Sequence, residues 1–92
     1  MLAALDRNQL AQNTLVVFFA DNGGENRHDN HPLRGYKRDT YEGGIRVPFA
    51  LRWPAKIPAG STYDQPVISL DLFATSLAIA GLQQPTDKPM DG

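Results

Sequence analysis

The run Leu15–Ala20 constrains the fold of this chain more than any other segment. All of its residues are apolar, with no polar alternation. A short run of this kind is typical of a strand buried on both faces, as in a parallel sheet that helices cover. The run ends at Asp21-Asn22-Gly23-Gly24, which is a strong turn signal. We therefore expect polar side chains at the carboxyl end of a buried strand.

The segments around this run predict a small α/β fold. Leu5 and Leu10 fit one apolar helix face, and a second helix is marked by Ser69 as N-cap and Gly81 as C′ residue. Pro48 cannot donate to a β ladder, so we expect it at a strand start or on an edge. The predicted single, partial domain at 1–92 has a helix at 1–12, a buried strand at 14–20, a site loop at 21–44, a strand at 45–53, a helix at 69–80 and a loose tail at 82–92.

The composition excludes several classes of function. The 92 residues carry a net charge of -1, so the chain has no electrostatic footprint for nucleic acid or for an anionic membrane. The absence of cysteine excludes a disulfide framework, a thiolate zinc site and a cysteine nucleophile. No stretch approaches the ~20 apolar residues of a membrane span. Any anion site must therefore depend on local placement of Arg and Lys.

The two ends of the sequence lead us to expect a piece of a longer protein. The segment Met1–Leu10 has no basic region before an apolar run, so it does not read as a signal peptide. The first predicted helix begins without an N-cap residue, and Met90-Asp91-Gly92 stops in a turn-like segment. Any targeting segment is then expected outside these residues.

Asp21 and Asn22 are the candidate metal ligands. Ligands of open α/β sheets bind outside the carboxyl ends of the strands, which is where this pair is predicted to lie. A carboxylate beside a carboxamide offers two hard oxygen donors, which suit calcium or magnesium rather than zinc. The same residues are also common in ordinary turns, and this alternative stays open.

The site loop also carries the cations Arg34, Lys37 and Arg38. A lysine ammonium is a compact point charge that suits an oxyanion such as sulfate or phosphate, although such a cluster can equally be a solvated surface. His28 and His31 are candidate metal ligands or acid–base groups, with simple exposure as the alternative.

The segment Tyr41–Pro48 is harder to explain as an ordinary turn. The adjacent Gly43 and Gly44 indicate backbone that needs a positive φ or a close approach. Glu42 and Arg46 bracket this turn and could pair across it. If buried, that pair would brace the loop that carries Lys37.

Taken in order, these motifs resemble the C-terminal part of the catalytic domain of the sulfatase (arylsulfatase) family, within the alkaline-phosphatase-like superfamily. They are Asp21–Gly24, Leu33–Lys37, Tyr41–Pro48, Arg52–Pro54, Pro66–Phe73 and Met90–Gly92. The resemblance implies an α/β sandwich that hydrolyses sulfate esters with a formylglycine nucleophile and calcium. It assigns Asp21 and Asn22 to the metal and Lys37 to the sulfate. Arg34 and Glu42 match supporting positions, and neither histidine matches a catalytic one.

The formylglycine motif of the family is missing from these residues, because there is no cysteine and no Ser-x-Pro/Ala-x-Arg. Since nucleophilic catalysis needs an activated group beside its base, we expect this chain to be inactive alone and to hold calcium weakly or not at all. The resemblance implies a sulfated small molecule or glycan as the substrate of the parent protein. It also implies a periplasmic, secreted or lysosomal location.

Two other functions remain open on the sequence. A small non-catalytic α/β domain could bind a partner or associate with itself through its truncated sheet. A phosphoesterase or phosphomutase of the same superfamily is disfavoured, because Leu33–Lys37 and Tyr41–Pro48 resemble sulfatases specifically.

Overall fold

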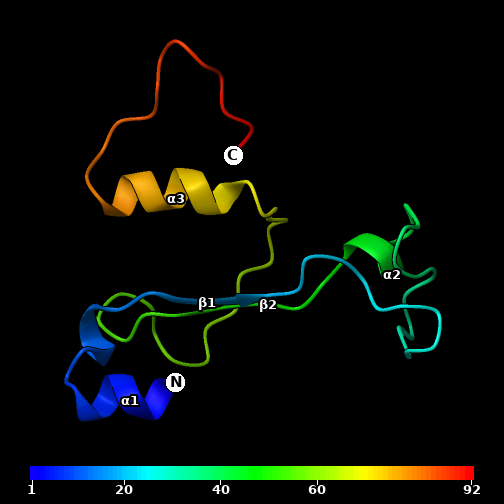
Figure 1. Cartoon of the computed structure of the whole chain (residues 1–92), viewed down its shortest axis with the longest axis horizontal. Coiled ribbons are helices and arrows are strands. Elements are labelled where there is room, and N and C mark those ends of the chain that lie inside the picture. The colour runs from blue at the N-terminus through cyan, green and yellow to red at the C-terminus, as the bar shows by residue number, and fades with distance from the viewer. The chain divides into compact units, whose positions relative to one another are not determined.

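The computed structural model describes residues 1–92, which form two compact units, Met1–Ser61 and Thr62–Gly92. The first unit contains α1 (Leu2–Arg7), a 3-10 turn η1 (Ala11–Asn13), β1 (Val16–Phe19), α2 (Glu42–Ile45) and β2 (Phe49–Arg52), and the second contains α3 (Asp71–Ile79) (Figure 1). No helix is long and apolar enough to cross a membrane.

The helix expected at 1–12 is shorter than predicted, because the chain turns at Gln9. That residue has a φ of 58°, in the left-handed region. The N–H of Gln9 donates to the carbonyl of Asp6 (3.1 Å) and the N–H of Leu10 to that of Leu5 (2.9 Å). These two bonds form a Schellman C-cap, which ends α1 at Arg7 and sends the chain into η1.

β1 and β2 form a two-stranded antiparallel sheet in which Val16 lies opposite Arg52 and Phe19 opposite Phe49. The expectation of a strand buried on both faces of a parallel sheet is wrong for these residues, since Phe18 is 65% exposed. The physical reason is that β1 has β2 as its only paired strand and that neither α1 nor α2 covers the sheet, which α1 reaches only through the ion pair of Asp6 with Arg52 at 3.6 Å. An apolar run encodes the need for burial but not the direction of its partner.

The strand expected at 45–53 begins only at Phe49, because the preceding residues form the single turn α2. The N–H of Arg46 closes that turn on the carbonyl of Glu42 (2.7 Å). Pro48 immediately precedes the strand, where its missing N–H costs nothing. Its carbonyl accepts the N–H of Ala20 at 3.3 Å, so pairing continues to the edge of the site loop.

α3 lies within the range 69–80 that the sequence predicts, and Gly81 takes the C′ position with a φ of 70°. Its N–H donates to Ala78 (3.1 Å) and the N–H of Leu82 to Leu77 (2.9 Å), which is a second Schellman cap. The predicted N-cap is wrong. The cap residue is Leu70, which makes no side-chain bond, and the Asp71 carboxylate instead accepts the N–H of Ile68 (2.7 Å).

The left-handed cap at Gln9 makes Gln9→Gly a stabilising change. Glycine removes a steric cost of about 1 kcal/mol at a positive φ. The control Asn8→Gly lies one residue earlier, at φ -94°, where glycine brings no relief, costs about 0.5–1 kcal/mol and also removes the bond from the Asn8 side-chain N–H to the Ala4 carbonyl (2.8 Å). Amide exchange of the Leu10 N–H should therefore slow in the first variant and quicken in the second. Faster exchange in both would contradict this account of the cap.

Candidate functional site

The site loop is held together by a contact between three glycines, which we call the glycine contact. Gly23, Gly43 and Gly44 are buried, and the N–H of Gly23 donates to the carbonyl of Gly44 at 2.9 Å. A Cβ on Gly43 would lie 2.7 Å from the Arg34 carbonyl oxygen, and one on Gly23 would lie 2.7 Å from the Gly43 carbonyl carbon. Only glycine allows these backbones to approach each other so closely.

Lys37 is attached to this frame through its backbone. Its N–H donates to the carbonyl of Gly24 at 2.8 Å, which ties it to the turn that follows Asp21 and Asn22. It also occupies the second position of a turn in which the N–H of Asp39 donates to the carbonyl of Tyr36 (2.9 Å). Arg38, the third residue, has the positive φ (80°) of a type II turn. The exposed ammonium of Lys37 makes no hydrogen bond or ion pair.

The two candidate metal ligands offer oxygen atoms that nothing else in the chain uses. The exposed carboxylate of Asp21 has no hydrogen bond or ion pair. The half-buried side chain of Asn22 donates its N–H to the carbonyl of Gly23 at 3.0 Å, which fixes the amide and leaves its oxygen free to accept. The donor chemistry fits calcium.

The number of donors does not complete a calcium sphere. No group of three or more His, Cys, Asp or Glu side chains could hold a metal here. Calcium takes about 6–8 oxygen ligands, so Asp21 and Asn22 could supply only part of such a site.

The basic residues of the loop have different surroundings. The guanidinium of Arg34 stacks on the ring of Tyr41 at 3.9 Å from its centroid, which orients it beside the glycine contact. Arg46 and Glu42 form the predicted pair at 3.2 Å, but the two side chains are 69% and 61% exposed. An exposed i,i+4 pair contributes about 0.3–0.5 kcal/mol, so it does not brace the loop as a buried pair would.

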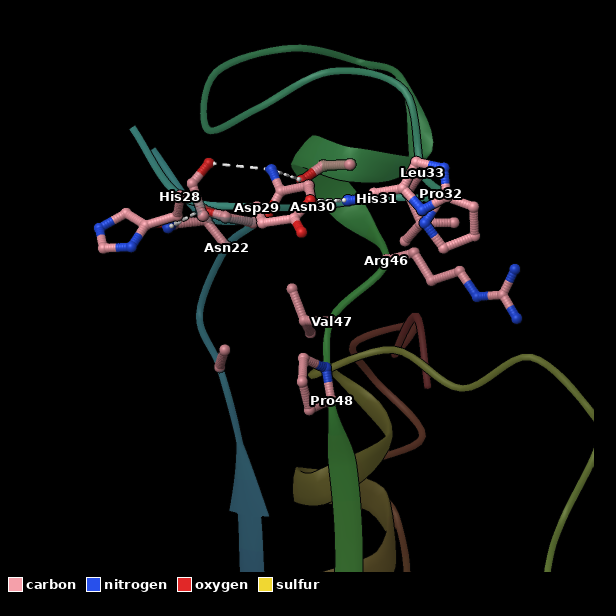
Figure 2. A pocket seen from close by; sticks show the side chains of 14 residues that line it. Asn22, His28, Asp29, Asn30, His31, Pro32, Leu33, Arg46, Val47 and Pro48 are labelled. Atoms are coloured by element: carbon pink, nitrogen blue, oxygen red, sulfur yellow. Dashed lines mark hydrogen bonds between the residues drawn. The ribbon is translucent and has the colours of Figure 1, made fainter. Parts of the chain in front are cut away.

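An open pocket of about 670 Å³ lies between the site loop and the strand ends (Figure 2). Asn22 is in its wall, together with apolar side chains such as Leu33, Val47 and Pro48. His28 and His31 also line it, and both are exposed. The pocket therefore adjoins one of the two candidate metal ligands.

Asn30 is the residue of this site that the sequence did not reveal. Its side-chain N–H groups donate to the carbonyls of Gly24 (3.2 Å), Gly35 (3.0 Å) and Gly43 (3.3 Å), and Figure 2 shows it in the pocket wall. In the sequence it is an asparagine in a polar loop, the usual sign of an ordinary turn. No local pattern marks a side chain whose partners lie on three separate segments.

Adding one methyl group to the glycine contact should open the loop. In Gly43→Ala the new Cβ meets backbone oxygens that cannot move independently, and overpacking of this kind costs about 1–3 kcal/mol. Amide exchange of Gly23 and Lys37 should become faster. The control is Gly60→Asn, at a φ of +74° with nothing within 4 Å of the new Cβ, where asparagine is tolerated. Unchanged exchange at Gly23 and Lys37 in Gly43→Ala would show that the glycine contact does not limit the opening of the loop.

Known proteins match most or all of this chain. The Sulfatase family model matches residues 1–82. Steryl-sulfatase of Rattus norvegicus is 43% identical over 102 residues, which cover 100% of this chain and 18% of that protein. N-acetylgalactosamine-6-sulfatase of Canis lupus familiaris is 39% identical over 98 residues, covering 100% and 19%.

A solved structure agrees in its backbone. The crystal structure of Ps i-CgsB in complex with k-i-k-neocarrahexaose matches with a TM-score of 0.93 and 42% identity, covering 99% of this chain and 21% of that one. The chain therefore spans about a fifth of the length of the relatives it matches.

Proposed function

The chain belongs to the sulfatase family, and we propose that it acts as one part of a longer enzyme that hydrolyses sulfate esters. In this proposal the chain supplies Lys37 as the sulfate contact and Asp21 and Asn22 as metal ligands. Arg34, held on Tyr41, supports the loop. The remainder of the enzyme supplies the nucleophile, so the chain alone has no turnover.

The observation that carries this proposal is the bond from the Lys37 N–H to the Gly24 carbonyl at 2.8 Å. It brings the backbone of the sulfate-binding candidate to the turn that follows both metal-ligand candidates. This bond fixes the backbone from which the Lys37 ammonium extends, and an ammonium at that position can stabilise negative charge on sulfate oxygens as it develops in the transition state. Its lack of any internal partner leaves it available for that anion.

Asp21 and the Asn22 amide oxygen would hold the calcium ion together with ligands from the rest of the enzyme. When bound, calcium would act as a Lewis acid and template for the sulfate group. These residues contain no cysteine and no Ser-x-Pro/Ala-x-Arg, so the formylglycine also belongs to the remaining part. The role left to this chain is to bind and orient the anion.

The substrate class that we propose is a sulfated small molecule or glycan. The proposal includes both small molecules and glycans. Two relatives are named for steryl and N-acetylgalactosamine-6-sulfate substrates, and the solved relative is bound to a neocarrahexaose. A periplasmic, secreted or lysosomal location of the parent enzyme remains part of the same proposal.

Self-association is the alternative that the exposed apolar side chains of β1 and β2 favour, among them Phe18 at 65% exposed.

The role of Lys37 can be tested in the full-length sulfatase that carries this segment. Lys37→Ala should lower kcat/KM for an aryl sulfate by about 10²–10³-fold, the usual loss when one donor to the developing negative charge is removed. Lys56→Ala removes the same charge from a loop outside the site and should leave kcat/KM unchanged. Equal effects of the two substitutions would refute a specific sulfate contact. The isolated chain should show no hydrolysis above buffer.

The metal ligands can be tested on the chain itself by calcium titration followed by amide NMR. Shifts should appear first at residues 21–24, with a Kd weaker than about 10⁻³ M because the coordination is incomplete. Asp21→Ala should remove them, whereas Asp64→Ala, in the second unit, should not. Shifts confined to other residues would overturn the ligand assignment.

A further inference from the structure

We infer that Asn30 is a positioning residue, which holds the backbone of Lys37 in place beside the turn that follows Asp21 and Asn22. This inference rests on the proposed function of Lys37, and it assigns a role to a side chain that touches neither sulfate nor metal. The starting point is the set of three carbonyl groups that accept its amide N–H bonds, from Gly24, Gly35 and Gly43.

Each of these carbonyls belongs to a different part of the site. Gly24 follows Asn22 by two residues and also accepts the N–H of Lys37 at 2.8 Å. Gly35 precedes Lys37 by two residues. Gly43 lies in α2, where its own N–H donates to the Arg34 carbonyl at 2.7 Å. One side chain therefore links the metal-ligand turn, the sulfate-contact loop and the helical turn that closes the loop.

The chemistry of this link requires a carboxamide. Three acceptors at 3.0–3.3 Å share two N–H groups, so at least one N–H is bifurcated. A carboxylate of the same shape would face three carbonyl oxygens with no proton to donate. Half-burial of the site limits the access of water that could replace the lost bonds.

The backbone around Asn30 is itself held in place. Its carbonyl accepts the N–H of Leu33 at 2.8 Å, and the preceding Asp29 carboxylate accepts the N–H of His31 at 2.8 Å. Asn26, four residues earlier in the same loop, makes no side-chain hydrogen bond. It therefore provides a matched control of the same residue type.

A double-mutant cycle in the full-length sulfatase tests the inference. Asn30→Ala should lower kcat/KM for an aryl sulfate by about 10–100-fold, the usual effect of losing a residue that orients a ligand. In the Lys37→Ala background the same change should have little further effect, because Asn30 acts through Lys37. Asn26→Ala should be neutral in both backgrounds. A purely structural role would instead lower the amount of folded enzyme and give multiplicative losses in kcat/KM.

The outcomes separate the two proposals. If Lys37→Ala alone leaves kcat/KM unchanged, the proposed function of Lys37 fails, and the inference about Asn30 fails with it. If Lys37→Ala is deleterious but Asn30→Ala is neutral, or if the two effects multiply, only the inference about Asn30 is overturned. Should Asn30→Ala fail to fold, Asn30→Ser, which retains one donor, is carried through the same cycle. An intermediate loss that again disappears in the Lys37→Ala background supports the inference.

Discussion

The candidate site depends on the close approach of the main chain to itself at Gly23, Gly43 and Gly44. This contact joins the start and the end of a long polar loop whose side chains are mostly exposed. The bonds that hold it run between main-chain atoms, apart from those donated by the side chains of Asn22 and Asn30. Because the loop buries so few apolar side chains, hydrophobic packing cannot fix its conformation.

The sequence indicated the close approach at Gly43 and Gly44 but only part of the fold around it. Gly43 and Gly44 were expected to provide either a positive φ or a close approach, and the structure selects close approach, because neither has a positive φ. Gly23 was expected as part of a turn, and it also packs against the backbone of Gly43 and Gly44. Local propensity can show that glycine is needed, but the partner is set by segments about 20 residues away in sequence.

The strand direction and Asn30 were beyond sequence reasoning for the same physical reason. An apolar run shows that a segment favours burial, but the residues that bury it lie elsewhere in the protein. In this chain the apolar side chains remain at least partly exposed, since Ala11 is the only buried hydrophobic residue. The relatives that this chain matches are about five times longer, so in the longer enzyme that we propose, other parts would cover these apolar side chains.

The stacking of Arg34 on Tyr41 has a consequence for how such a site can diversify. The Arg34 guanidinium is oriented by an aromatic face, whereas the Lys37 backbone is held by the hydrogen bond from its N–H to the Gly24 carbonyl, so the two cations are placed by independent means. A replacement at Tyr41 would free one cation without displacing the other. Natural variation could therefore retune the charge around a bound anion in steps, while the backbone scaffold beneath stayed constant.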